Sequence, residues 1–448
     1  MYTAGPSTGF TAKGRATRER ILQSAARVIL DDGLSGLSLD KVRQAAAVSG
    51  SQLSHYYTDK QALIRAVMER QMEVVLGFHR QPVLGGLDTF DDFERWLDLN
   101  MRYLRKIGYT GTPTYHALAG QLMKSDEQTR HTLAAGYEQW ISLLEQSFQR
   151  MLDRGILMTS ADPKALAMVV VAGHQGAGTL TFAYRQEWPL SDTLRFVVNY
   201  LRLFAADPAE RVARPPRRQR GRRKPTVVVD DASQRFTRKG LATRARIIDG
   251  AAELMFRDGV GGTSLDDVRR AVGVSGSQIA HYFAGKRDLT RQVIAARAGD
   301  VLEFHRRPEF SQLGSIAAIR AWAKACERQL ETVYLRGGCI YGSLTGELLE
   351  DAEVLDDLAA GYEKWIDLFY SGLSAMRSKG DLVEQADPHH LAVALVAAHQ
   401  GGTMLAFATG HPEPFRAVVG AAVDYVASFA VTPEKRSRRA ISRRSAKS

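Results

Sequence analysis

The sequence predicts an all-α fold in which one helical unit occurs twice. Residues Phe10–Lys60 align with Phe236–Lys286 without a gap at an offset of 226, with 28 identities in 51 positions. Apolar residues inside each copy recur at spacings of three and four, the period of an amphipathic helix. A chain of 448 residues is long enough for several domains, each with its own core.

The likeness continues beyond these segments, with a slip of one residue. Trp96 recurs as Trp322, and His-Gln-Gly at 174–176 recurs at 399–401. Two long copies indicate a duplication, because a solenoid needs at least three short repeats. We therefore expect two complete copies, joined by a Pro- and Arg-rich linker at 207–235.

Positive charge is concentrated in two segments. The net charge is +11, yet Arg211–Lys224 carries eight basic residues and no acid, and Lys435–Ser448 carries seven and no acid. Without these fifteen charges the rest of the chain stands at −4. We expect the linker to be a flexible connector and 433–448 to be a disordered tail, both attracting phosphate without reading sequence. A minor-groove contact by residues 220–225 is the alternative for the linker.

Composition favours a cytoplasmic protein. No uncharged apolar run of membrane-spanning length stands out, and Met1–Arg15 lacks the apolar core of a secretory signal. The two cysteines, Cys326 and Cys339, are too few for a disulfide framework or a four-cysteine metal site. We expect reduced thiols, no metal and no cofactor.

The first helix of each copy is amphipathic and ends at a glycine. In the first copy Ile21, Ala25, Val28 and Ile29 share one face, and Gly33 stops the pattern. The second copy has the same arrangement at the same offset.

Two further short helices follow in each copy. Ser38 and Ser49 are suited to cap them in the first copy, and Ser264 and Ser275 in the second. The third helix has few apolar anchors beyond Leu53 and is otherwise polar. Three short helices with a tight turn between the second and third are typical of a helix-turn-helix.

A run of short motifs spans residues 17–63. Thr-Arg lies near its start, Asp-Gly closes the first helix, Ser-Leu-Asp opens the second, Val-Ser opens the third, and His-Tyr-Tyr precedes Asp59-Lys60 at the start of a fourth. This stretch resembles the DNA-binding domain of the TetR (tetracycline-repressor) family, and 243–289 resembles a second one. The resemblance implies helix-turn-helix domains at 10–60 and 236–286, each followed by a helical effector-binding and dimerisation domain, at 61–206 and 287–432.

Periodicity predicts the helices of the first of these larger domains. They are expected over 58–78, 89–104, 114–124, 127–154, 163–184 and 191–204. In the family, the last two helices of two subunits form a four-helix bundle. The resemblance therefore implies that the two halves of this chain supply the bundle as an intramolecular pseudo-dimer.

The third helix of each head is the expected DNA-reading element. A recognition helix reads base edges with its N-terminal residues, while other groups hold phosphates. Gln52 and Gln278 are the best base readers, because a carboxamide can bond adenine N6 and N7 together. A solvated surface side chain is the alternative for each residue. The expected DNA contacts are Lys13, Thr17, Arg18, Ser49, Ser51, Gln52, His55, Tyr56, Lys60, Lys239, Thr243, Arg244, Ser275, Ser277, Gln278, His281, Tyr282 and Lys286.

Aromatic and histidine positions shared by the copies are candidates to line an effector pocket between helices. Core packing explains most of them equally well, and a buried inert thiol is the simpler interpretation of Cys339. The two histidines are favoured, because a polar ring in an apolar helix needs a partner. The expected pocket residues are Trp96, Tyr115, Tyr137, Trp140, His174, Trp322, Cys339, Tyr341, Tyr362, Trp365 and His399.

The resemblance implies a single-chain, pseudo-dimeric, ligand-responsive transcriptional regulator, acting as a repressor on a near-palindromic operator and released by a small-molecule effector. Its expected partners are double-stranded DNA and that effector, and further association of whole chains stays open. An architectural or nonspecific DNA-binding protein is one alternative, and a helical enzyme with vestigial DNA-binding heads is another. No glycine-rich phosphate loop or catalytic triad is shared by both copies, so we expect no enzyme. The expected location is the bacterial cytoplasm, at the nucleoid.

Overall fold

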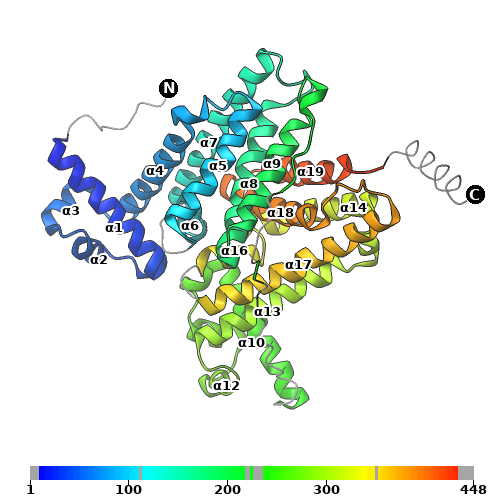
Figure 1. Cartoon of the computed structure of the whole chain (residues 1–448). Coiled ribbons are helices and arrows are strands. Elements are labelled where there is room, and N and C mark those ends of the chain that lie inside the picture. The colour runs from blue at the N-terminus through cyan, green and yellow to red at the C-terminus, as the bar shows by residue number, and fades with distance from the viewer. Residues whose placement is uncertain are drawn as a thin grey trace, which may run out of the picture.

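The computed structural model describes residues 10–109, 114–216, 222–223, 225, 236–348 and 352–431. Every regular element in these ranges is helical, which confirms the predicted all-α fold (Figure 1). The chain forms two similar helical units whose longest apolar helices meet in the middle of the molecule.

Each unit begins with one long and two short helices, here called the first head (residues 12–56) and the second head (238–282). The first unit consists of α1 (Ala12–Gly36), α2 (Leu39–Ala45), α3 (Gly50–Tyr56), α4 (Lys60–His79), α5 (Phe90–Ile107), α6 (Tyr115–Leu122), α7 (Glu127–Asp153), α8 (Pro163–Tyr184) and α9 (Trp188–Arg202). The second consists of α10 (Arg238–Gly262), α11 (Leu265–Val272), α12 (Gly276–Tyr282), α13 (Lys286–His305), α14 (Ile316–Glu327), α15 (Leu335–Gly337), α16 (Gly342–Glu347), α17 (Ala352–Lys379), α18 (Pro388–Thr409) and α19 (Glu413–Ser428).

Local sequence signals set the helix ends. Gly33 and Gly259 adopt φ of 69° and 81°, so α1 and α10 bend sharply where the pattern predicts a stop. The hydroxyls of Ser38 and Ser49 cap α2 and α3 by accepting a hydrogen bond from the backbone N–H three residues on. The predicted ends of α4 to α9 agree with the structure to within three residues. The largest shift at a helix start is in α9, which begins at Trp188 because Pro189 suits a first turn.

The core of the first unit is centred on a histidine that binds two tryptophans. Nε2 of His79 accepts hydrogen bonds from the indole N–H groups of Trp96 (3.1 Å) and Trp140 (3.2 Å). Its Nδ1–H donates to the carbonyl oxygen of Val75, one turn earlier in α4 (2.8 Å). This network joins α4, α5 and α7 and leaves no hydrogen-bonding group of the ring unused.

The second unit repeats this arrangement. Nε2 of His305 accepts from the indoles of Trp322 and Trp365, both at 2.8 Å, and Nδ1–H donates to the carbonyl of Val301. Burial lowers the pKa of His79 and of His305 to about 4. Both rings are therefore neutral in the folded protein at physiological pH.

The two units join where α8 crosses α18. A Cβ atom at Gly176 would lie 1.9 Å from the carbonyl oxygen of Ala397, and one at Gly401 would lie 1.7 Å from that of Ala172. Only glycine permits backbones to approach so closely. Helices α9 and α19 pack alongside, and in Figure 1 these four helices lie where the two units meet.

Helices α8 and α18 are also long and apolar enough, by length and composition, to cross a membrane. The expectation that no such run exists is therefore wrong. Of their most apolar stretches, 78% of α8 and 94% of α18 is buried inside the protein. Their hydrophobicity is explained by packing against each other and against α7, α9, α17 and α19.

The described part of the linker packs on the body, whereas a flexible connector was expected. The Arg222 guanidinium donates to Glu363 of α17 (2.6 Å) and lies over the Trp188 ring of α9, 4.5 Å from its centroid. Pairing with a buried carboxylate and an aromatic face explains why a basic residue stays on the protein. Most of the linker's basic residues, and the whole predicted tail at 433–448, lie outside the described residues.

The crossing of α8 and α18 yields the first prediction. Gly176→Ala and Gly401→Ala should each lower the free energy of unfolding by about 1 to 3 kcal/mol or more, because the added methyl group meets a backbone carbonyl that cannot move aside. Urea denaturation followed by circular dichroism measures this. Gly420→Ala, with no atom near its would-be Cβ in α19, is the control and should be neutral or stabilising. Equal effects at all three sites would contradict the close crossing.

Protonation of the core histidines yields the second prediction. Between the ordinary histidine pKa of 6.5 and the folded value of about 4, the unfolded chain binds protons that His79 and His305 do not. The free energy of unfolding should therefore fall as the pH drops through this window, by up to about 1.4 kcal/mol per pH unit for each histidine. Urea denaturation at a series of pH values measures it. A stability that stays constant from pH 7 to about pH 4.5 would contradict the neutral rings.

Candidate functional site

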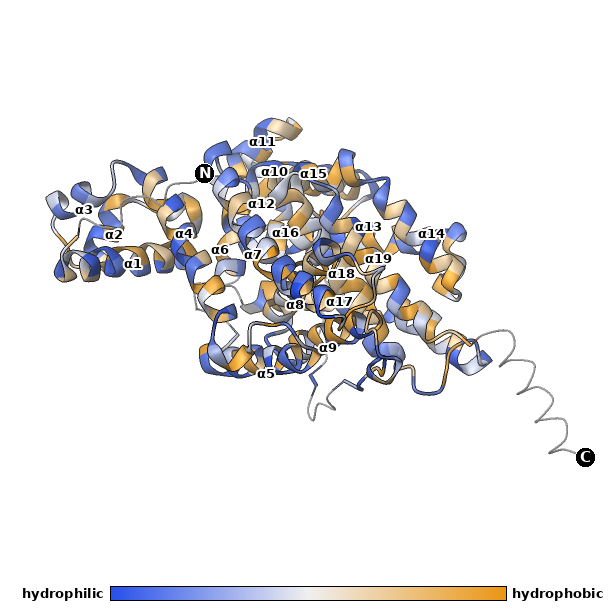
Figure 2. Ribbon diagram, turned by 90° about the horizontal axis from the view of Figure 1, so that it is seen from above, coloured by the Kyte–Doolittle hydropathy of each residue, from blue (hydrophilic) through white to orange (hydrophobic). Residues whose placement is uncertain are grey.

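The two predicted recognition helices, α3 and α12, expose nearly the same polar surface. Leu53 and Ile279 are the buried anchors, at 4% exposure each. The polar residues of each helix face outward, and the first head projects from the body (Figure 2). The exposed predicted DNA contacts on or beside these helices are Ser49, Ser51, Gln52 and His55 in the first head, and Ser275, Ser277, Gln278 and His281 in the second.

The predicted base readers are engaged in helix capping in the free protein. Oε1 of Gln52 accepts from the backbone N–H of Ser49 (2.9 Å), and the Ser49 hydroxyl accepts from the backbone N–H of Gln52. Gln278 and Ser275 form the same capping box. The amide Nε2 of each glutamine is not used by this box, and its Oε1 accepts one hydrogen bond there, which leaves one lone pair.

Tyr56 and Tyr282 hold the N-terminal end of the first helix of each head. The Tyr56 ring packs on Phe10 at 5.2 Å between centroids, and its hydroxyl donates to the carbonyl of Gly14 (3.0 Å). Tyr282 packs on Phe236 at 5.1 Å. Their predicted role as phosphate contacts stays a prediction, and the contacts give them a positioning role in addition.

Several predicted cationic contacts point back onto the protein. Nζ of Lys60 donates to the carbonyl of Leu34 (2.9 Å), at the bend of α1, and burial lowers its pKa. Arg244 donates to Gln292 (2.5 Å) and lies over the Phe283 ring.

The remaining predicted cations and hydroxyls of the heads differ in exposure. Lys13 and Lys239 are exposed near the start of α1 and α10, while Thr17 is buried and donates to the Lys13 carbonyl. Arg18 and Thr243 are half-buried, as is Lys286, whose pKa is lowered by burial. Lys13, Lys239 and the exposed residues of α3 and α12 are therefore the predicted contacts most available to DNA.

The first unit encloses an apolar cavity of about 140 Å³ between α4, α5, α7 and α8. Three predicted pocket residues line it, Tyr115, Trp140 and His174. Val74 and Tyr103 also line it and are more than a third exposed, so they mark its mouth. Trp96 and Tyr137 are buried behind the lining: Trp96 binds His79, and the Tyr137 hydroxyl donates to Gln175 (3.1 Å).

The polar groups around this cavity are uncharged. Nδ1–H of His116 donates to Oε1 of Gln175 (2.8 Å), and Nε2–H of His174 donates to Oδ1 of Asn100 (3.1 Å). Burial lowers the pKa of His116 to about 4 and that of His174 to about 3. None of the described lining residues is an acid, a lysine or an arginine.

The second unit has a hollow of about 400 Å³ at the equivalent place. Of the predicted residues, Cys339, Trp365 and His399 line it. Trp322, Tyr341 and Tyr362 are fully buried outside its lining. Burial raises the pKa of the Cys339 thiol, which agrees with the inert interpretation of that residue.

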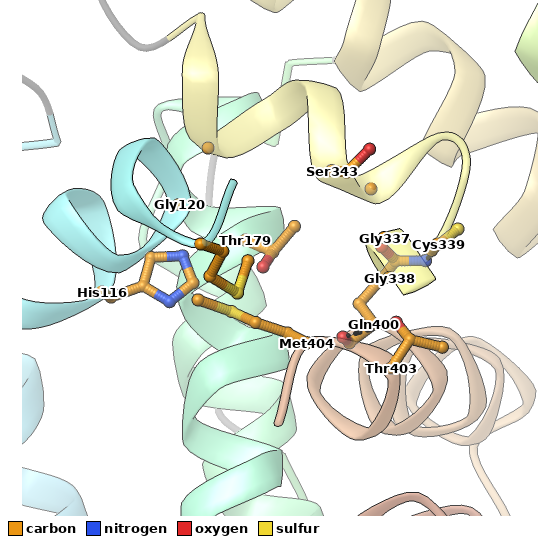
Figure 3. Close-up of a pocket in the computed structure, with 13 residues that line it drawn as sticks. His116, Gly120, Thr179, Gly337, Gly338, Cys339, Ser343, Gln400, Thr403 and Met404 are labelled. Atoms are coloured by element: carbon orange, nitrogen blue, oxygen red, sulfur yellow. Dashed lines mark hydrogen bonds between the residues drawn. The ribbon is translucent and has the colours of Figure 1, made fainter. Parts of the chain in front are cut away.

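A further small cavity lies between the units. His116 and Gly120 of the first unit face Cys339, Ser343 and Gln400 of the second across it (Figure 3). Gly120 and Gly346 touch through their backbones, since a Cβ on either would lie 2.6 Å from the other Cα. The two units are thus in direct contact at α6 and α16 as well as at α8 and α18.

A buried ion pair beside this contact ties the first unit to the second head. Nζ of Lys124 donates to Glu347 (2.7 Å) and to the carbonyl of Met255 in α10 (2.9 Å). The other carboxylate oxygen of Glu347 accepts from the backbone N–H of Val260 (2.5 Å). Both charged side chains are under a tenth exposed. No repeat pattern signalled them, since Gln121 stands in the first copy where Glu347 stands in the second.

The comparisons with known proteins agree with this architecture. The model of the bacterial regulatory proteins of the TetR family matches residues 21–67 and 247–293, one match in each head. The model of a tetracycline-repressor-like C-terminal domain matches residues 315–422.

Curated relatives are regulators. The transcriptional repressor NemR of Escherichia coli is 24% identical over 188 residues, covering 41% of this chain and 94% of NemR. The transcriptional regulator UidR of the same species is 30% identical over 73 residues. This match covers 16% of this chain and 37% of UidR.

Solved structures of similar proteins cover less than half of this chain. A TetR regulatory protein from Rhodobacter sphaeroides is 20% identical, with a TM-score of 0.37, over 41% of this chain and 98% of that one. A TetR regulator from Chloroflexus aurantiacus is 23% identical, with a TM-score of 0.38, over 43% and 98%. The matches to the family models, together with the NemR relative, show that the chain belongs to the TetR family of transcriptional regulators and carries two TetR-like units in tandem.

Proposed function

We propose that the chain is a single-chain, pseudo-dimeric transcriptional repressor that binds a near-palindromic operator and leaves it when a small molecule binds. The observation that carries this proposal is the presence of two exposed recognition helices of almost the same sequence on one chain. Residues 48–52 and 274–278 are identical, and their units join through α8 and α18. A pair of such heads is what a two-half-site operator requires.

The two heads read almost the same half-site. Gln52 and Gln278 contact base edges, while Lys13 and Lys239 meet the flanking phosphates. If the units are related by a pseudo-twofold axis, the half-sites are inverted and their centres lie about one helical turn, roughly 34 Å, or somewhat more apart. Ser54 against Ala280 is a small source of asymmetry.

The cavity of the first unit supports the effector role. Helix α4 directly follows the first head, and Gln71, Val75 and Phe78 of α4 line the cavity. A ligand that occupies the space between α4 and α8 changes the position of α4 and, with it, the position of the head. Ligand and operator then favour different separations of the heads, so each weakens binding of the other.

An architectural, sequence-indifferent DNA-binding protein remains the alternative, and we propose no catalytic role. We place the protein in the cytoplasm, on chromosomal DNA. Selection of bound sequences from a random DNA pool separates the two functions: the repressor returns two related, inverted half-sites, and the architectural protein returns no preference.

The stoichiometry of the operator complex is the third prediction. One chain of 49.4 kDa should occupy one operator, because it supplies both heads. Native mass spectrometry of the complex with a selected operator measures this, and a duplex holding one half-site, which should bind far more weakly, is the control. Finding only complexes with two or more chains on a minimal operator would contradict the single-chain reader and indicate a dimer of fused pairs.

Base reading by the glutamines is the fourth prediction. Gln52→Ala and Gln278→Ala should each relax one half-site, with a loss of about 1 to 3 kcal/mol of discrimination per bidentate contact. Ser54→Ala is the matched control, because the Ser54 hydroxyl donates to the Gly50 carbonyl and Ala280 already stands at the equivalent position. Competition binding with single-base operator variants gives the discrimination. If the Gln52→Ala protein kept every base preference, Gln52 would not read bases and this prediction would be wrong.

A further inference from the structure

The effector cavities of the two units differ at positions that the repeat aligns. Gly108, which ends α5 with φ of 80° and has no side chain, is replaced by Tyr334. Leu190, which lines the first cavity from α9, is replaced by Phe415. Both changes add a ring to the second unit where the first has space. The two cavities are therefore not equivalent.

Tyr334 occupies the inner part of the second cavity. Its hydroxyl hydrogen-bonds Nε2 of His399 (3.0 Å), and its ring lies 5.3 Å from the ring of His399 and 5.4 Å from that of Phe415. Tyr334 is 5% exposed. In the first unit the cavity reaches α8 at Gln175, Gly178 and Thr181, whereas the described lining of the second hollow contains no α18 residue except His399. The hollow of the second unit stops at Tyr334.

The mouths of the two cavities also differ in charge. Val74 at the mouth of the first corresponds to Asp300 in the second, and Arg307 also lines the second hollow. Two charged residues thus line the second hollow, whereas none of the described residues lining the first is charged. The first cavity is enclosed by apolar side chains and neutral histidines, where an uncompensated charge is strongly disfavoured.

Two polar atoms in the lining residues of the first unit lack an internal partner. Nδ1 of His174 and the hydroxyl of Thr181 are buried with no hydrogen bond to the described residues. In the second unit Nδ1 of His399 receives a hydrogen bond from Nε2 of Gln400 (3.4 Å), and Thr181 is replaced by Ala406. Among the lining residues of these two cavities, the buried side-chain polar atoms without a partner among the described residues therefore belong to the first unit.

We infer that each chain binds one effector molecule, in the first unit only, and that this effector is an uncharged, ring-sized apolar molecule with one small hydrogen-bonding group. The cavity of about 140 Å³ is close to the roughly 150 Å³ of an engineered apolar cavity that binds benzene. In the second unit, the phenol ring of Tyr334 takes the place of such a molecule and is hydrogen-bonded to His399. This inference rests on the proposed function only where it concerns the effect of the ligand on DNA binding.

Binding of matched small probes tests the site. The probes are p-cresol, the equally sized hydrocarbon p-xylene, and charged 4-methylbenzoate, titrated into the full chain with calorimetry and ligand-observed NMR. We expect one site per chain for both neutral probes and at least tenfold weaker binding of the benzoate. Thr181→Val should weaken p-cresol several-fold and leave p-xylene unchanged. Two equal sites, equal binding of the benzoate, or no binding of either neutral probe would overturn the inference.

Exchanging the filling residues between units tests the location. Leu190→Phe should reduce p-xylene affinity at least tenfold, because it places the ring of the second unit in the first cavity. Tyr334→Ala with Phe415→Leu should raise the stoichiometry from one site to two. Thermal unfolding confirms that each variant is folded. A folded Leu190→Phe protein with unchanged affinity, or a folded double variant that still binds one probe, would exclude this assignment.

Operator binding is measured separately with the same proteins. If the probes bind once in the first unit and the chain shows no operator preference, the proposed function fails and the site stands. If the operator is bound specifically and the neutral probes bind nowhere or twice, the site assignment fails and the DNA-reading function stands.

Discussion

The backbone contact between α8 and α18 determines the arrangement of the rest of the molecule. Glycines at 176 and 401 let each helix place a carbonyl where the other has no side chain. The apolar residues on either side are thereby buried against the other half. The larger helical part of each unit is built on one of these helices, and each head is joined to it by α4 or α13. The positions of the heads therefore depend on this helix crossing, together with the ion pair of Lys124 and Glu347 beside the second head.

Local features of the fold could be predicted from the sequence. The bends at Gly33 and Gly259, the serine caps and most helix ends depend on neighbouring residues, and the duplication supplied each signal twice. Long-range contacts could not be predicted. The indole groups that bind His79 lie 17 and 61 positions away along the chain, and nothing in periodicity links them. For the same reason Trp96 was expected in the pocket although it belongs to the core behind it.

The sequence predicted where the candidate site lies, because the third helix is polar, but it did not predict the hydrogen bonds of the site residues. A polar third helix indicated the reading surface, yet the sequence did not show that Oε1 of Gln52 caps its own helix or that Lys60 binds the Leu34 carbonyl. The difference between the effector cavities depends on Gly108 and Tyr334, which align without a gap and whose effect appears only when the neighbouring helices are in place.

Joining both units in one chain also changes how occupancy depends on protein concentration. A repressor assembled from separate subunits must first pair, so at low concentration its occupancy rises with the square of the subunit concentration. Here the partner of α8 is always present, because α18 belongs to the same polypeptide. Occupancy of a site that takes one chain then rises with the first power of concentration, down to a few copies per cell. A damaged unit, moreover, stays with its own partner and cannot exchange into intact molecules.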